Sequence, residues 1–337
     1  MLASLRRTLS GAARAFPPTR GALAAWRRFK VSRRPVLPET TDAPWRLFNV
    51  ELTNRCPFTC IMCSRTNNMK RDQGLMTFET FQAVVDEYAV AQPEKARTEL
   101  TWLHHFGESL THPEFGRFIR YAVSKGVKAA MSVNPLMMTP AVAQDLLDSG
   151  VHTLSISLDG HDDESFKAIR GVPNAYQKSK DNLLAFLEKK VATGNPVVVN
   201  LSMIDFAKNR GSIERVRAFW EQVPGINVFA AKEFKVWNGD AADVNVLADE
   251  QVDNAERRKR NGRVACTIPW QQMSVTWDGD LVPCCYDYDK KYSYGKVKDG
   301  IAKAWNGERM RALRREFNAN EVTNPLCATC PDLYPPD

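Results

Sequence analysis

The sequence predicts an α/β fold in which a partial (β/α)6 TIM-like barrel is followed by a small C-terminal unit of one hairpin and one helix. Between residues 46 and 237, six runs of β-branched and aliphatic residues alternate with segments of helical periodicity. Such alternation favours parallel strands with right-handed crossovers. A tight Asp278-Gly279 turn between two short apolar runs predicts the hairpin.

The predicted barrel strands are short apolar runs, and six of them occur in succession. They cover residues 47–52, 99–104, 127–133, 151–158, 197–203 and 226–236. The fourth run alternates most clearly, because Ser155 and Ser157 interrupt an apolar series at every second position. Six units fall short of a closed eight-stranded barrel, so we expect an open sheet with its chemistry at the carboxyl ends of the strands.

The predicted crossover helices place apolar residues at helical spacing after each strand. They cover residues 77–90, 112–125, 140–149, 163–169, 175–191 and 212–222. Pro140 and Gly150 mark the two ends of the third helix. A polar connecting segment, 238–262, with a helix near 249–259, then leads to the C-terminal unit. That unit covers 263–337, with strands at 273–277 and 281–285 and a helix at 300–317.

The net charge of +7 over 337 residues comes from the N-terminus. Residues 1–38 hold nine basic and no acidic side chains, and the remainder holds 37 basic and 39 acidic residues. The folded body therefore lacks the basic footprint of a nucleic-acid-binding protein. We interpret 1–45 as a basic arm and linker, with three readings open: a solvated arm, a segment on an anionic membrane surface, or a mitochondrial transit segment. No apolar run approaches the ~18 residues of a membrane helix. We expect a cytoplasmic protein.

Eight cysteines form two groups separated by a long cysteine-free stretch. In a non-secreted chain, this pattern favours metal or redox chemistry over disulfides. Cys56, Cys60 and Cys63 have the spacing C-x3-C-x2-C directly after the first strand. Three thiolates on a short loop suit an iron–sulfur cluster with one open iron, or zinc if a fourth ligand joins them. His104 and His105, which end the second strand, are the candidate partners for such a zinc site.

This cysteine spacing after a first strand resembles the radical S-adenosylmethionine (SAM) superfamily, and the resemblance extends over about residues 47–337. It implies a catalytic [4Fe–4S] cluster on the three cysteines, with SAM bound at the open iron. It further implies that SAM is reductively cleaved to a radical that abstracts hydrogen from a substrate. A low-potential electron donor such as a flavodoxin or ferredoxin would supply the electron.

Other segments match that superfamily less fully. Phe106-Gly107-Glu108-Ser109 is similar to its Gly-Gly-Glu-Pro motif, which implies that Gly107 and Glu108 bind the amino group of SAM; residues 106 and 109 depart from the motif. Met62 stands where the family often has an aromatic residue over the adenine. The resemblance assigns five further cofactor-binding residues: Ser132 and Asn134 at the ribose, Ser157 and Asp159 in the fourth-strand segment, and Arg170 at the carboxylate.

The second cysteine group combines Cys266 and Cys284, spaced C-x12-G-x4-C, with Cys327 and Cys330, spaced C-x2-C. Taken alone, four thiolates suit a closed structural zinc site. Beside the first group, they resemble the SPASM domain and its shorter form, twitch. This resemblance implies a second, auxiliary [4Fe–4S] cluster with all four cysteines as ligands and a role in electron transfer. Cys285 has three open roles: a packed side chain, a hydrogen-atom donor, or a ligand in place of Cys284.

The substrate is less defined. The arm before the first strand is too basic and too interrupted by proline to form a peptide-recognition domain, so we expect a small polar substrate such as a sugar or aminocyclitol. We expect dehydrogenation or, if Cys285 donates hydrogen, epimerisation. The candidates to face the substrate are Glu233, Lys235, Trp237, Tyr286 and Asp287. The alternatives are a peptide-modifying maturase and, in a different class, a zinc-stabilised binding protein without catalysis.

Overall fold

A single open sheet runs through the computed structural model, which describes residues 22, 25–26, 29, 35–249 and 251–334. Its strands are β1 (Arg46–Val50), β2 (Thr101–Trp102), β3 (Ala129–Val133), β4 (Thr153–Ser157), β5 (Val198–Asp205), β6 (Val228–Glu233), β7 (Gln272–Val275), β8 (Asp280–Val282) and β9 (Gly295–Lys296). Their order in space is β6-β5-β4-β3-β2-β1-β7-β8-β9. Every pair from β6 to β7 is parallel, which confirms the predicted parallel, unclosed barrel.

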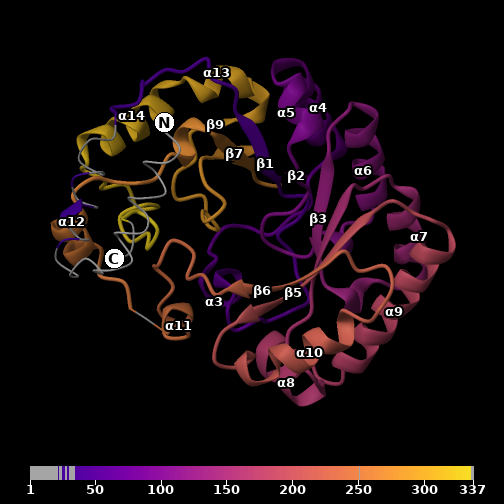
Figure 1. Ribbon diagram of the computed structural model, residues 1–337. Coiled ribbons are helices and arrows are strands. Elements are labelled where there is room, and N and C mark those ends of the chain that lie inside the picture. Colours follow the sequence, from indigo (N-terminus) through magenta and orange to yellow (C-terminus); the bar gives the residue numbers. More distant parts are fainter. Residues whose placement is uncertain (1–21, 23–24, 27–28, 30–34, 250, 335–337) are drawn as a thin grey trace, which may run out of the picture.

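Helices cover the outer face of this curved sheet (Figure 1). In the barrel they are α4 (Phe78–Ala91), α5 (Pro93–Thr98), α6 (Phe115–Ser124), α7 (Pro140–Asp148), α8 (Asp163–Arg170), α9 (Tyr176–Ala192) and α10 (Ile213–Trp220). The short α3 (Ser64–Asn68) follows Cys63 and lies inside the curve of the sheet instead. The starts of the outer helices follow the local sequence. Thr77 caps α4 by accepting the amide of Thr80, and Asp162 and Ser165 form a capping box at α8. The short helix α5 was missed, although Pro93 at its first position favours a helix start.

The two faces of the barrel sheet differ in chemistry. Leu154 and Ile156 on β4 are fully buried under the helices, as is Leu201 on β5. Their neighbours in sequence point the other way, into the lumen of the half-barrel. There the strand register aligns Ser132 on β3 with Ser155 on β4, and Ser155 with Asn200 on β5. The lumen is thus lined by polar side chains, whereas the hydrophobic core lies between sheet and helices.

The predicted hairpin is not a separate unit, because it extends the barrel sheet. Strand β7 pairs in parallel with β1, with Arg46 opposite Gln272 and Val50 opposite Val275, and β8 and β9 then pair antiparallel. This pairing joins segments more than 200 residues apart in sequence, and local sequence patterns do not predict such a contact. The sheet is therefore continuous across the predicted boundary between 46–237 and 263–337.

The C-terminal half contains α11 (Ala242–Asn245), α12 (Asn254–Asn261), α13 (Ile301–Trp305) and α14 (Glu308–Ala319). The single helix predicted at 300–317 was wrong, because Asn306 and Gly307 break it into α13 and α14. Trp305 packs on Trp45 with ring centroids 5.8 Å apart, and Trp45 in turn packs on Tyr88 of α4 at 5.6 Å. These contacts fix the C-terminal helices to the start of β1.

The nine basic residues of the N-terminal arm lie outside the described residues, so the three readings of the arm stay open. Within the described ranges, no helix combines the length and the apolar character needed to span a bilayer.

Candidate active site

The first cysteine loop is held from several sides. The amide groups of Thr59 and Ile61 donate to the carbonyls of Arg170 and Ile169, which join the loop to the end of α8. The Arg65 guanidinium donates to the carbonyl of Phe58 at 2.6 Å. Gly171 closes α8 with φ of 78°, and a Cβ there would lie 1.8 Å from Thr59 Oγ1. Only glycine therefore allows α8 to approach the loop so closely.

Cys56, Cys60 and Cys63 line one cavity of about 200 Å³ at the carboxyl ends of the strands. The structure brings six of the seven predicted cofactor-binding residues to the same cavity: Gly107, Glu108, Ser132, Asn134, Ser157 and Arg170. Met62, His104, His105, Ile204 and Trp237 also line it. Asp159 does not line the cavity. It is fully buried behind Arg170, with which it forms an ion pair.

The thiols fit a cluster. All are free, and burial raises the pKa of Cys56 to about 12 and that of Cys63 to about 11, so a cationic metal centre is needed to hold them as thiolates. Among the described residues, no three His, Cys, Asp or Glu side chains converge enough to hold a single metal ion. The three cysteines line one cavity of about 200 Å³, and a multi-iron cluster has room there that a single ion would not need. His105 Nε2 lies 2.8 Å from the carbonyl oxygen of Cys285. That ring nitrogen is therefore already hydrogen-bonded outside the cysteine loop.

Glu108 supplies a carboxylate to the cavity. Its Oε1 accepts the amide of Leu110 at 3.1 Å and its Oε2 accepts the amide of Asn134 at 2.9 Å. Burial raises the pKa of Glu108 to about 7, because the protein does not offset the lost hydration with a strong cationic partner. A bound cation would therefore stabilise the ionised carboxylate. Gly107 has φ of 94°, and a Cβ there would lie 2.4 Å from the carbonyl of Thr53. The Gly107-Glu108 pair thus fits a site for an ammonium group.

Arg170 faces the cavity from the end of α8. Its Nη1 lies 3.5 Å from Cys60 Sγ, and its Nη2 forms the ion pair with Asp159. Asp159 Oδ1 accepts the amide of Ile204 at 2.8 Å and the side-chain amide of Asn209 at 2.7 Å. Because Asp159 is fixed by these two hydrogen bonds, it orients the Arg170 guanidinium. The buried Nε of Arg170 has no hydrogen-bond partner among the described residues. That donor suits a carboxylate ligand.

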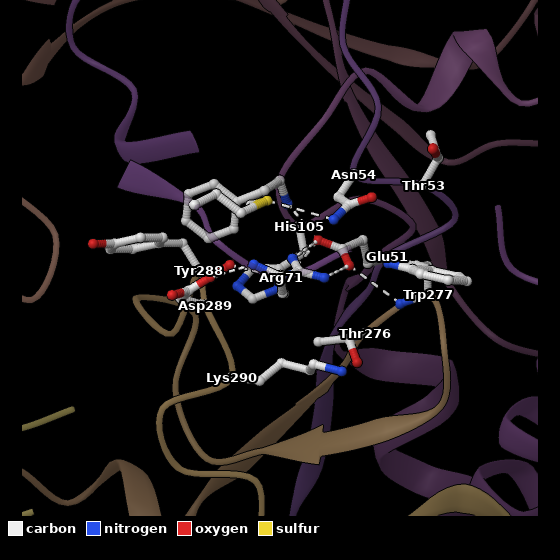
Figure 2. A network of polar contacts seen from close by, with 12 residues as sticks. Glu51, Thr53, Asn54, Arg71, His105, Thr276, Trp277, Tyr288, Asp289 and Lys290 are labelled. Atoms are coloured by element: carbon white, nitrogen blue, oxygen red, sulfur yellow. Dashed lines mark hydrogen bonds and ion pairs between the residues drawn. The ribbon is translucent and has the colours of Figure 1, made fainter. Parts of the chain in front are cut away.

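A buried polar network behind the cavity connects the barrel to the C-terminal hairpin (Figure 2). Arg71 donates to both oxygens of Glu51, at 2.7 and 2.6 Å, and its Nε donates to the carbonyl of Tyr288. Glu51 Oε1 also accepts the amide of Phe106, and Oε2 accepts the amide of Trp277. One carboxylate thus contacts the Phe106-Gly107-Glu108 segment and the hairpin. Sequence reasoning missed Glu51 and Arg71, although an acid at the end of a buried strand is a signal in itself.

The second cysteine group lines another cavity, of about 110 Å³. Cys266, Cys284, Cys327 and Cys330 face it together with apolar side chains, including Phe317 and Leu326. Burial raises the pKa of Cys266 to about 11 and that of Cys330 to about 12. As at the first site, buried thiols of raised pKa fit a metal cluster. Cys285 lines this second cavity as well, so five thiols surround it.

The five residues predicted to face the substrate lie in different environments. Glu233 and Lys235 form an ion pair with each other at 2.8 Å, and both are exposed. Asp287 accepts the amides of Lys291 and Tyr292, which is a loop-holding role. Trp237 alone among them lines the first cavity: its ring packs on Phe106 at 5.0 Å and its Nε1 donates to the carbonyl of Met62.

Tyr286 lines the second cavity and contacts the Trp237 ring at 6.0 Å. Trp237 holds a left-handed backbone with φ of 54°, which is unusual for such a large residue. The two aromatic rings therefore lie between the two cysteine-lined cavities.

Comparison with known proteins agrees with this geometry. Residues 50–210 match the Radical SAM superfamily, and residues 266–331 match SPASM, an iron-sulfur cluster-binding domain. Mycofactocin maturase MftC of Mycobacterium ulcerans is 30% identical over 328 residues, covering 86% of this chain and 80% of that protein. AdoMet-dependent heme synthase of Methanosarcina barkeri is 29% identical over 140 residues, and the match spans only 38% of that protein.

Solved structures share the fold at low sequence identity. SuiB of Streptococcus suis bound to precursor peptide SuiA has a TM-score of 0.63 at 11% identity, covering 87% of this chain and 75% of that one. BtrN in complex with AdoMet and 2-DOIA has a TM-score of 0.56 at 13% identity, covering 86% and 94%. With both domain matches and a relative matched over most of its length in agreement, the chain belongs to the radical SAM superfamily, with a [4Fe–4S] cluster and SAM as cofactors and a SPASM domain for auxiliary iron–sulfur cluster binding.

Proposed function

We propose that this enzyme abstracts a hydrogen atom from a small polar substrate, such as a sugar or aminocyclitol, and dehydrogenates it. When bound and reduced, the cluster at Cys56, Cys60 and Cys63 supplies the electron that cleaves SAM into the hydrogen-abstracting radical. One observation carries the proposal: the three thiols share a single cavity with Glu108 and Arg170, whose charges match the ammonium and carboxylate of SAM.

The chain's own residues have distinct roles in this proposal. Glu108 binds the ammonium group, and Arg170, oriented by Asp159, binds the carboxylate. Met62 and Trp237 cover the apolar side of the cavity and exclude water. A flavodoxin or ferredoxin is the proposed electron donor.

Dehydrogenation is favoured over epimerisation by the position of Cys285. An epimerase of this kind needs a hydrogen donor beside the substrate radical. Cys285 instead lines the second cavity, with the proposed auxiliary ligands, and its carbonyl faces His105. An auxiliary cluster on Cys266, Cys284, Cys327 and Cys330 would accept the electron that the substrate radical releases as it loses a proton.

A peptide substrate is the second candidate. It is supported by the 30% identity to a maturase over 86% of this chain and by the shared fold of SuiB, whose structure contains a precursor peptide. A peptide maturase would use the same cavity and the same SAM-binding residues, but its substrate would enter as an extended chain.

Product analysis in deuterium oxide separates these outcomes. The reconstituted enzyme, with SAM and a chemical reductant, is assayed with small aminocyclitols and sugars and, separately, with short peptides encoded near its gene. A carbonyl product without solvent label at carbon supports dehydrogenation, whereas deuterium at a product carbon supports epimerisation. Turnover of peptides alone would replace the small-molecule proposal.

A further inference from the structure

Lys232 is a cation of the half-barrel lumen that does not line the cofactor cavity. The strand register pairs Ile204 on β5 with Lys232 on β6, and Ile204 lines the cofactor cavity. Paired residues of a parallel sheet point to the same face, so Lys232 points to the lumen. Its ammonium reaches across β5 and donates to Ser155 Oγ on β4 at 2.9 Å.

The neighbouring charges differ from Lys232 in their partners. Glu233, the next residue of β6, points to the opposite face and forms an ion pair with Lys235, which follows the strand. Strand β6 is the open edge of the sheet, so the stem of Lys232 remains accessible there while the ammonium is turned inward. Lys232 is therefore positioned to contact a molecule that enters the half-barrel.

The Lys232 ammonium lacks a countercharge. Within the described part of the chain, its only hydrogen-bond partner is the neutral Ser155 hydroxyl, and no carboxylate lies within ion-pair distance. The acid that attracts it, Asp159, is already committed to Arg170, Ile204 and Asn209. The Lys232 side chain is exposed at the sheet edge, whereas partial desolvation of its ammonium lowers its pKa, because no countercharge offsets the lost hydration.

Two side chains of the lumen face have buried polar atoms without a hydrogen-bond partner among the described residues. These atoms are His104 Nδ1 and Asn200 Oδ1, and Asn200 is the strand partner of Ser155. Burial, with the nearby charges of His105 and Lys232, lowers the pKa of His104 to about 3, so its ring is neutral and has an N–H to donate. His104 also lines the cofactor cavity, which makes the two sites adjacent.

We propose that Lys232, with Ser155 and His104, forms a site for a carboxylate of the substrate, next to the cofactor cavity. Lys232 and His104 donate hydrogen bonds to the two carboxylate oxygens, and the Ser155 hydroxyl is released from Lys232 to donate as well. A single ammonium beside two neutral donors matches the single charge of a carboxylate better than a doubly charged phosphate. This inference rests on the proposed function, in which a substrate enters the lumen, and it narrows the small polar substrates considered there to those that carry a carboxylate, such as a sugar acid.

The test uses crystals of the reconstituted enzyme with SAM bound, soaked in bromide, which scatters X-rays anomalously. We expect a bromide peak within hydrogen-bond reach of Lys232 Nζ. Acetate in excess should displace the peak, whereas acetamide, its neutral counterpart, should not. The peak should be lost in Lys232→Gln and kept in Lys232→Arg, which retains the charge, and in Lys235→Gln, the matched control just after the strand.

Three results would overturn the site: no bromide at Lys232 in the wild type, displacement by inorganic phosphate but not by acetate, or Lys232 bound to SAM itself. SAM cleavage and iron content are measured on the same preparation. Failure of those two measurements refutes the proposed function, whereas a missing peak in an active enzyme refutes only the carboxylate site.

Discussion

Arg71 and Glu51 form a two-point ion pair, with N–O distances of 2.7 and 2.6 Å, and their side chains are only 5% and 0% exposed. Arg71 follows the cysteine loop, and Glu51 follows β1. Through the amides of Phe106 and Trp277, the Glu51 carboxylate connects the cofactor-binding segment to the hairpin of the SPASM region. This buried charge pair thus adds a polar connection between the two regions to the β1–β7 strand pairing.

Breaking this pair should destabilise the protein strongly. Glu51→Gln leaves Arg71 as an uncompensated buried charge, and we expect a loss of about 3–5 kcal/mol in the free energy of unfolding. Chemical denaturation measures it. Glu114→Gln is the control, because the Glu114–Arg117 pair is 47% and 54% exposed and should contribute at most about 1 kcal/mol. Equal effects of the two substitutions would contradict the role assigned to Glu51.

Glu108 should act on SAM binding and leave cluster content intact. Glu108→Gln keeps the shape of the side chain but removes the charge that faces the SAM ammonium, so we expect an affinity for SAM at least about tenfold lower. Equilibrium binding of SAM and iron analysis on the same samples check this. Unchanged SAM affinity would exclude Glu108 from the site, and loss of iron would assign it a role in cluster assembly.

Gly107 should resist substitution for two separable reasons. Gly107→Ala forces a Cβ into a left-handed backbone and within 2.4 Å of the Thr53 carbonyl. Gly194→Ala is the matched control, because Gly194 has φ of 63° but open space around its Cα. We expect about 1 kcal/mol of destabilisation at residue 194, from backbone strain alone. At residue 107 we expect a larger loss together with weaker SAM binding. Equal thermal stability of the two variants would show that the predicted clash is absent.

The roles of the adjacent thiols Cys284 and Cys285 can be separated by iron analysis. If Cys284 is the ligand, Cys285→Ser should retain about eight irons per chain, whereas Cys284→Ser should fall toward about four. The opposite pattern would assign Cys285 as the ligand. Sulfide analysis on both variants distinguishes a lost cluster from adventitious iron.

Much of the fold was predictable because it depends on local periodicity. The alternation around Ser155 and Ser157 identified β4, and Thr77 marks the start of α4 through its capping hydroxyl. The pairing of β7 with β1 was not predictable, because it joins distant segments without a local signal. The sequence also suggested Lys235 and not Lys232, because both faces of strand β6 carry apolar residues and then one charged residue, Lys232 or Glu233, so its alternation does not reveal which side meets the lumen.

In the candidate site, too, the local features were predictable from the sequence and the long-range contacts were not. The cysteine spacing identified both thiol groups, because ligand sets on short loops are local features. Asp159 was assigned to the cofactor, yet it lies behind Arg170, because sequence distinguishes a ligand from its supporting residue only through the three-dimensional fold. The Glu51–Arg71 pair, the unpaired nitrogen of His104 and the inward ammonium of Lys232 required the folded chain.

The central claim is that Cys56, Cys60 and Cys63 hold a cluster with one iron open to SAM. The most direct measurement is electron paramagnetic resonance of the reduced enzyme with Cys266, Cys284, Cys327 and Cys330 replaced by alanine, before and after addition of SAM. We expect about four irons and four sulfides per chain and a [4Fe–4S] signal that shifts when SAM binds. A signal that SAM leaves unchanged, or a protein that holds zinc without sulfide, would contradict the account.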